Sequence, residues 1–383
     1  MPVTTVHQLL PALLPGDAVG SHTLEVRRTL RDLGLESEIF CEAVHPQLEG
    51  EGRHFSELPS PGPRGMLVYQ LAIGSVLADV VHARPGPLVV DYHNVTPAGY
   101  FRSWDAKVAA ALTLARQQLG LLADKAVLGL GDSAFNVAEM KEVGYDPTAV
   151  VPILLDLSRL GGRADPAVSD RLLRARAGGG ADLLFVGRIA PNKAQEDLVK
   201  ALAAYRAVYD PRARLHLVGR AAADSYVDGL RRFVAGAGLA DAVEIADGGV
   251  SHEALCAYYQ SADVFVGLSE HEGFCVPLLE AMHHRLPVVA YGAAAVPETL
   301  GEGGIVLATK HPLTVAAAVH RLVDDPGLRE AVVAAGEARL AEFALERSRV
   351  RLVRALAPFT GIDALPTAAG GPPQPPAAGA PAA

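Results

Sequence analysis

Short apolar runs alternate with longer amphipathic stretches along most of the chain. Runs of strand length, bounded by turn residues, occur at Gly65–Tyr69, Pro87–Tyr92, Lys125–Leu130, Asp182–Val186, Arg214–Val218, Asp263–Leu268 and Leu286–Tyr291. Between them lie segments with helical spacing of apolar residues, such as Ser21–Leu33 and Ala194–Val208. Alternating elements of this length predict parallel sheets covered by helices on both faces, with right-handed crossovers.

One segment, Asp156–Gly180, interrupts this alternation. It is polar, rich in arginine, and ends in consecutive glycines. We therefore interpret it as a linker between two doubly wound α/β domains, over residues 1–160 and 161–344. In sheets of this kind ligands bind beyond the carboxyl ends of the strands, so the cleft between the two domains is the expected site.

The chain ends in helical patterns and then a segment of low complexity. The helical patterns cover Leu313–Val323, Gly327–Phe343 and Glu346–Leu356. We expect a helix at about residues 345–360 to pack back on the first domain. Residues 364–383 are rich in Pro, Gly and Ala and cannot bury enough apolar surface, so they predict a disordered tail.

Composition and charge narrow the function classes. Half of the 383 residues are hydrophobic and one fifth are charged, as in a globular protein. The net charge of −9 argues against a nucleic-acid-binding protein. The cysteines at 41, 256 and 275 are few and far apart, so they indicate neither disulfides nor a zinc site. The chain has no signal-peptide pattern and no membrane-length apolar run, so we expect a cytoplasmic location and leave peripheral membrane contact open.

The strongest candidate for chemistry is Ser269–Met282, SEHEGFCVPLLEAM, in which seven residues separate Glu272 from Glu280. Pro277 suits the first turn of a helix, so the preceding amides would face the cleft at the positive end of that helix. Such a site binds an anion or sugar hydroxyls, and Glu280 can accept both hydroxyls of a ribose. Alternatively, Glu272 caps the helix and Glu280 lies on a solvated face.

The segment Leu183–Lys193, LLFVGRIAPNK, places two cations beside a glycine at a strand end. Gly187 gives a tight turn there, and Arg188 and Lys193 together predict a pyrophosphate clamp. The alternative is a pair of surface cations near a turn.

Two further features lie in the first domain. His93, in VVDYHNVTP, follows a strand and could face the cleft and form a hydrogen bond with a sugar hydroxyl, although a lone histidine is as often structural. The loop LPGDAVG, residues 14–20, contains Gly16, whose backbone could approach a phosphate closely.

Taken in order, these motifs resemble glycosyltransferase family 4, whose members are retaining enzymes of GT-B fold: two doubly wound, Rossmann-like parallel-sheet domains that face a cleft. The likeness extends from about residue 5 to about residue 345. It is most specific in VGRIAPNKAQEDLVKAL and in AYYQSADVFVGLSEHEGFCVPLLEAM.

The resemblance implies a role for each motif residue. Arg188 and Lys193 would neutralise the donor diphosphate, Glu280 would hold the ribose, and Glu272 and His93 would contact the transferred sugar. The residues that it places around the donor are Gly16, Asp17, Gly187, Arg188, Lys193, Gly219, Gly249, Val250, Glu272, Gly273, Phe274, Cys275, Val276 and Glu280. The catalytic set that it implies is His93, Glu272, Arg188 and Lys193.

The implied activity moves a hexosyl group from a UDP- or GDP-linked sugar to a hydroxyl acceptor, with retention. The acceptor is a polysaccharide, a glycolipid or a natural product, and nucleic acid is not a partner. The chain has no Asp-x-Asp motif, so we expect catalysis without a metal and without a cofactor. The alternatives are a GT-B sugar phosphorylase, a nucleotide-sugar epimerase and a non-catalytic nucleotide-sugar-binding protein.

Overall fold

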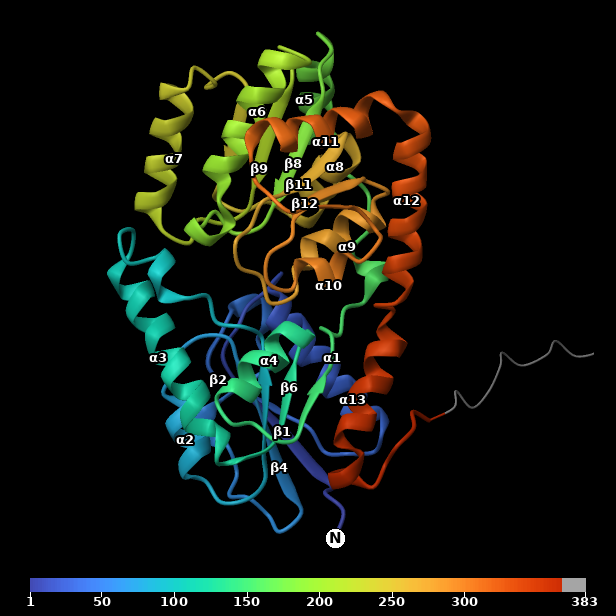
Figure 1. Ribbon diagram of the computed structural model, residues 1–383. Coiled ribbons are helices and arrows are strands. Elements are labelled where there is room, and N and C mark those ends of the chain that lie inside the picture. Colours follow the sequence, from blue (N-terminus) through green and yellow to red (C-terminus); the bar gives the residue numbers. More distant parts are fainter. Residues whose placement is uncertain (367–383) are drawn as a thin grey trace, which may run out of the picture.

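The computed structural model describes residues 1–366 and contains two parallel β-sheets, one above the other in Figure 1. The predicted tail, residues 364–383, lies outside the described residues from position 367 onward. The first sheet has the strand order β3-β2-β1-β4-β5-β6-β7 and the second has the order β10-β9-β8-β11-β12-β13. The predicted doubly wound α/β architecture is therefore confirmed.

The strands of the first sheet come from the first 150 residues: β1 (Thr5–Leu13), β2 (Ile39–Val44), β3 (Arg53–His54), β4 (Gly65–Leu71), β5 (Leu88–Tyr92), β6 (Ala126–Gly131) and β7 (Thr148–Val150). Those of the second sheet are β8 (Asp182–Val186), β9 (Arg214–Val218), β10 (Val243–Ala246), β11 (Val264–Gly267), β12 (Val288–Tyr291) and β13 (Ile305–Leu307). Each predicted apolar run coincides with one of these strands. The central residues of the strands that coincide with these runs are buried because helices cover both faces of each sheet.

Helices flank each sheet. Around the first sheet lie α1 (Ala18–Asp32), α2 (Leu77–Ala83), α3 (Ala106–Ala123) and α4 (Ala134–Glu142). Around the second lie α5 (Pro166–Arg176), α6 (Gln195–Val208), α7 (Asp224–Gly236), α8 (His252–Ser261), α9 (Val276–His283), α10 (Val296–Leu300), α11 (Pro312–Asp324) and α12 (Pro326–Ala341). Short 3₁₀ turns occur at Pro46–Leu48, Phe55–Glu57, Ala98–Tyr100, Leu157–Arg159 and Pro191–Lys193. Within residues 1–366, no helix combines the length and the apolar character needed to cross a bilayer.

The last helix, α13 (Leu345–Thr360), returns to the first sheet. In Figure 1 the chain runs down α12 beside the second sheet and continues as α13 beside the first. Leu352 and Leu356 are buried there in one apolar cluster with Val6 of β1. The backbone of Phe359 also accepts a hydrogen bond of 2.9 Å from the Val3 amide.

The segment Asp156–Gly180, interpreted as the linker between the domains, contains the helix α5, which the sequence analysis did not predict. The Asp165 carboxylate caps α5 by accepting a hydrogen bond of 3.0 Å from the Val168 amide. Leu172 is buried in the apolar cluster of the second sheet. One apolar residue on an arginine-rich helix is a weak sequence signal, because the rest of the helix surface is polar.

Loops at the carboxyl ends of the strands join the two sheets. Ser133, before α4, donates a hydrogen bond of 2.8 Å to the backbone oxygen of Gly273, before α9. The next amide, that of Ala134, donates to the Glu298 carboxylate of α10 at 2.8 Å. The strand ends of both sheets therefore border one shared space, which is where a ligand of this class of fold is expected.

Candidate active site

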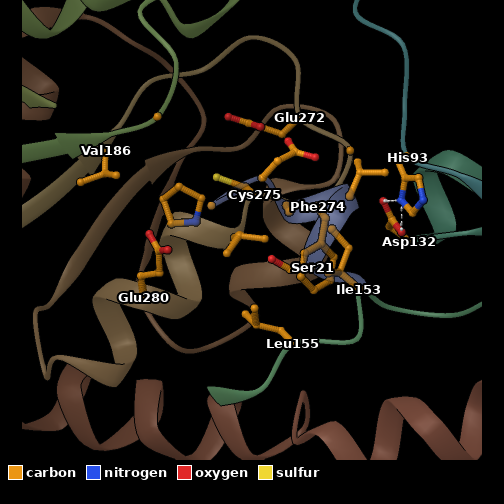
Figure 2. Close-up of a pocket in the computed structure, with 18 of the residues that line it drawn as sticks. Ser21, His93, Asp132, Ile153, Leu155, Val186, Glu272, Phe274, Cys275 and Glu280 are labelled. Atoms are coloured by element: carbon orange, nitrogen blue, oxygen red, sulfur yellow. Dashed lines mark hydrogen bonds and ion pairs between the residues drawn. The ribbon is translucent and has the colours of Figure 1, made fainter. Parts of the chain in front are cut away.

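A cavity of about 560 Å³ lies between the two sheets and is lined from both. The predicted residues that line it are Gly16, Asp17, His93, Gly187, Arg188, Lys193, Glu272, Gly273, Phe274, Cys275, Val276 and Glu280. Figure 2 shows Glu272, Cys275 and Glu280 on one side of the cavity and His93 on the other. Motifs that are far apart in the sequence are therefore brought together in one cavity.

Gly219, Gly249 and Val250 are not among the residues that line this cavity. Packing explains instead why both of these positions are glycine, because a Cβ atom at either one would clash. A Cβ atom on Gly219 would lie 1.9 Å from the Gly187 oxygen, and one on Gly249 would lie 2.8 Å from Arg220 Nε. Strands β8 and β9 pair in register through Val186 and Val218, so the loops that follow them lie against each other.

The two predicted clamp cations differ in their surroundings. Lys193 ends the 3₁₀ turn Pro191–Lys193, and its Nζ lies 2.5 Å from Glu272 Oε1. Their side chains are only 12% and 9% exposed, so this ion pair is nearly buried. Arg188 is exposed, and its guanidinium has no carboxylate within 4.0 Å among residues 1–366. The cavity therefore offers one unpaired cation and one that a carboxylate already neutralises.

The amino end of α9 lines the cavity, and no side chain caps it. Cys275 is the N-cap residue, in a left-handed conformation with φ 72°, and Pro277 lies in the first turn as predicted. A Cβ on Gly273 would lie 2.4 Å from the Cβ of Asn94, so only glycine allows this loop to meet the first sheet. The unsatisfied amides and the helix dipole together favour a negatively charged or hydroxyl-rich ligand here.

Glu280 lines the cavity one turn further along α9. Its Oε2 accepts a hydrogen bond of 2.6 Å from the Tyr259 hydroxyl. Burial raises the pKa of Glu280, and the hydrogen bond from Tyr259 offsets part of that effect. The Tyr259 hydroxyl therefore holds the Glu280 carboxylate in place. The alternative interpretation placed Glu280 on a solvated face, and the structure does not support it.

The side chain of His93 is fully engaged inside the protein. Gln8 Nε2 donates a hydrogen bond to the Thr23 backbone oxygen. Gln8 Oε1 is therefore an acceptor, and Gln70 Nε2 donates to it. The Gln70 oxygen must then accept from His93 Nε2, at 2.5 Å. His93 Nδ1 lies 3.0 Å from the Asp132 carboxylate, as the dashed lines in Figure 2 show.

Both ring nitrogens of His93 are thus donors to protein atoms, and the ring is a buried imidazolium. Burial lowers the pKa of His93, but the carboxylates of Asp132 and Asp91 outweigh it and raise that pKa to about 9. We predicted that His93 would offer a hydrogen bond to a sugar. In this structure its side chain has no hydrogen-bonding group left for one, because the ring is 1% exposed and both nitrogens are taken.

Three buried residues, His22, Asp91 and His93, place possible metal-ligand atoms within 4.8 Å of one another. The hydrogen bonds do not fit a metal site. His22 Nδ1 accepts from the Leu154 amide at 2.9 Å, so its proton lies on Nε2, which donates to Asp91 at 2.9 Å. A metal-bound histidine usually donates from its other nitrogen, which His22 cannot do here.

The structure adds cavity residues that the sequence analysis did not single out. His271, Asn94 and Asp132 all line the cavity. His271 precedes Glu272 in the motif SEHEGF, and Asn94 follows His93. For His271 and Asn94, adjacency to a candidate site residue at a strand end was the signal that could have identified them. Asp132 follows the strand β6, and that position was its only signal.

Comparison with known proteins places the chain in a family. The family Glycosyl transferases group 1 matches residues 180–325, which include α9, Arg188 and Lys193. The D-inositol 3-phosphate glycosyltransferase of Thermomonospora curvata is 32% identical over 319 residues, which cover 77% of this chain and 70% of that protein. The enzyme of the same name from Geodermatophilus obscurus is 28% identical over 89% of this chain and 85% of its own length.

Solved structures show the same architecture. HepE of Anabaena, in complex with UDP-glucose, has a TM-score of 0.71 at 18% identity and covers 92% of this chain and 99% of its own. Sucrose-phosphate synthase of Thermosynechococcus elongatus has a TM-score of 0.68 at 18% identity and covers 91% and 97%.

Two parallel sheets that face a shared cavity form the GT-B fold, as the resemblance implied. More narrowly, the chain belongs to the glycosyl transferases of group 1, the family 4 enzymes expected from its motifs. The protein is therefore an enzyme that transfers a sugar.

Proposed function

We propose that this enzyme moves a hexosyl group, with retention, from a nucleoside-diphosphate sugar to a hydroxyl acceptor bound in the same cavity. One observation above all supports a nucleoside-diphosphate sugar as the donor. Arg188, Lys193, the amino end of α9 and Glu280 line a single cavity, so two cations and free amides can surround a diphosphate while a carboxylate holds a ribose. A glycosidase or a protein that binds neutral sugars has no need of that combination.

A uridine nucleotide is the first donor to test. HepE of Anabaena was solved with UDP-glucose, and a trehalose-6-phosphate protein of E. coli was solved with UDP-2-fluoro glucose. Both share the fold with this chain and are far from it in sequence, at 18% and 11% identity.

The proposed reaction takes place on one face of the sugar. The bond from the anomeric carbon to the diphosphate oxygen breaks, and the bond to the acceptor oxygen forms on the same face, so the configuration is retained. The leaving phosphate oxygen takes the proton of the acceptor hydroxyl. Arg188, Lys193 and the amides of α9 stabilise the charge that grows on the diphosphate, which is the largest electrostatic contribution available in this cavity.

Lys193 has two partners in this scheme. Before the donor binds, it pairs with Glu272 at 2.5 Å. A diphosphate that enters the cavity competes with Glu272 for the same ammonium group. Glu272 is then free to accept a hydrogen bond from a hydroxyl of the transferred sugar.

The acceptor side of the cavity favours an acceptor without a phosphate group. The first sheet and its loops contribute the carboxylates of Asp17, Glu25, Asp132 and Asp156 to the lining. Asp132 pairs with the His93 imidazolium, and Glu25 pairs with Arg28 outside the lining. Arg159 is the arginine that this side contributes among the described residues, and its Nε lies 3.1 Å from the Asp156 carboxylate. The relatives are named for inositol 3-phosphate, so free inositol and inositol 3-phosphate form a matched pair of acceptors to compare.

A thermal-shift panel of UDP-glucose, UDP-N-acetylglucosamine, GDP-mannose and inorganic phosphate tests the donor, since a ligand that binds only the folded protein raises the melting temperature. We expect a UDP-sugar to give the largest shift, and release of UDP when an acceptor is added. Turnover that requires inorganic phosphate and releases no nucleotide would support the phosphorylase instead. Binding with no transfer to any acceptor would support the non-catalytic binding protein.

A further inference from the structure

Besides His93 and His252, a third histidine, His271, lines the cavity beside the ion pair of Lys193 and Glu272. It follows β11, precedes Glu272 in the sequence, and is only 8% exposed. The ring of Phe135 meets it edge-on, with the ring centroids 5.7 Å apart. The position of its ring is therefore fixed by packing.

A chain of hydrogen bonds fixes which nitrogen of His271 carries the proton. Asn136 Nδ2 donates to the Tyr92 backbone oxygen at 3.1 Å, and a carbonyl can only accept. Asn136 Oδ1 must therefore accept, and it does so from Asn94 Nδ2 at 2.9 Å. Asn94 Oδ1 is then an acceptor too, so His271 Nε2, 2.7 Å away, must be the donor.

The other nitrogen, Nδ1, carries a lone pair. Burial lowers the pKa of His271 to about 4, and the positive charge of Arg116 acts in the same direction. The ring is therefore neutral at physiological pH. Within residues 1–366, no group donates a hydrogen bond to Nδ1. The cavity thus contains a nearly buried acceptor in a fixed orientation that has no donor in the protein.

We infer that His271 binds the transferred sugar by accepting a hydrogen bond from one of its hydroxyls at Nδ1. This inference rests on the proposed function. A phosphate oxygen cannot supply the proton at neutral pH in the way that a hydroxyl can, and the neighbouring Glu272 belongs to the part of the cavity proposed for the sugar. The contrast with His93 supports the choice, because both nitrogens of His93 already donate to protein atoms.

The test compares UDP with UDP-glucose by isothermal titration calorimetry on the full chain and two variants. In His271→Gln the side-chain amide can still donate to Asn94, but no acceptor remains at the Nδ1 position. His271→Asn places an amide oxygen near the Nδ1 position and gives up the contact with Asn94. We expect His271→Gln to weaken UDP-glucose binding about ten-fold and to change UDP binding by less than about two-fold.

The conservative variant and a set of sugar analogues separate this role from a merely structural one. His271→Asn should recover part of the lost affinity for UDP-glucose. Among deoxy analogues of UDP-glucose, the one that lacks the contacting hydroxyl should bind the wild type and His271→Gln equally, as expected for a coupled pair.

Three other results would overturn the inference, and each has a different meaning. If His271→Gln binds UDP-glucose as tightly as the wild type does, His271 makes no hydrogen bond to the sugar, and the proposed donor site stands. If UDP and UDP-glucose are weakened equally, the histidine supports the fold of the site and does not bind the sugar. If the wild type binds neither UDP nor UDP-glucose, the proposed donor fails together with this inference.

Discussion

Replacing Lys193 by alanine should destabilise the folded chain, whereas replacing Arg188 should leave its stability unchanged. Lys193 Nζ lies 2.5 Å from Glu272 Oε1, and both side chains are about nine-tenths buried. Lys193→Ala leaves the Glu272 carboxylate buried without its partner. Arg188 has no carboxylate partner among residues 1–366, so Arg188→Ala leaves no buried charge without a partner.

The size of this effect follows from the burial of the pair. Removing one partner of a fully buried ion pair costs about 3–5 kcal/mol. Because this pair lines a cavity that water can enter, we expect a smaller loss than that range, about 2–3 kcal/mol for Lys193→Ala. The double variant Lys193→Ala/Glu272→Gln also removes the unpaired Glu272 charge and should recover most of the lost unfolding free energy.

Urea unfolding and calorimetric titration with UDP measure the two effects separately. Arg188→Ala should keep its unfolding free energy within about 0.5 kcal/mol of wild type, since surface substitutions rarely cost more. It should still bind UDP at least about ten-fold more weakly, the scale of one charge-assisted contact to a diphosphate. Equal stability of Lys193→Ala and Arg188→Ala would refute the reasoning about the ion pair, and unchanged UDP affinity in both variants would remove the clamp.

Three further predictions concern protonation, backbone geometry and metal dependence. The folded-state pKa of His93, about 9, exceeds its unfolded value of 6.5, so the stabilisation from its pairing with Asp132 is complete below pH 6.5 and is lost as pH rises toward 9. The unfolding free energy of the wild type should therefore fall over that interval, and His93→Gln should flatten the slope. Cys275→Gly should raise the unfolding free energy by about 0.5–1 kcal/mol, because the left-handed φ of 72° is strained for any residue with a Cβ atom. Gly273→Ala should have the opposite effect and weaken UDP binding as well, since its Cβ would lie 2.4 Å from that of Asn94; equal melting temperatures for the two variants would contradict this. Finally, sugar transfer should be unchanged in excess chelator, and activity restored only by an added divalent cation would contradict the proposed metal-independent mechanism.

Local patterns in the sequence predicted most of the fold. An apolar run such as Asp182–Val186 is a buried strand because both faces of a parallel sheet are covered, and this depends only on neighbouring residues. The turn at Gly187 and the helix start at Pro277 are also local features, so the loop with Arg188 and the amino end of α9 were predicted correctly. The helix α5 was not predicted because Leu172 is its one buried residue, so its sequence shows no apolar stripe.

The state of each side chain in the cavity could not be predicted in the same way. Whether the ring nitrogens of His93 are free to bind a ligand depends on Gln70 and Asp132. These residues lie in β4 and directly after β6. Lys193 and Glu272 were assigned to separate roles, and their ion pair exists only because β8 and β11 are neighbours in the sheet. The protonated nitrogen of His271 is decided by Asn94, in the loop after β5 of the first sheet. Such partners are set by topology and not by spacing along the chain.

A crystal structure of the enzyme with UDP tests the central claim most directly. The account predicts the diphosphate between Arg188 and the amino end of α9, with Lys193 turned from Glu272 toward a phosphate and the ribose hydroxyls at Glu280. UDP bound outside the cavity between the sheets, or inside it with Arg188 and Glu280 both out of contact, would contradict the account.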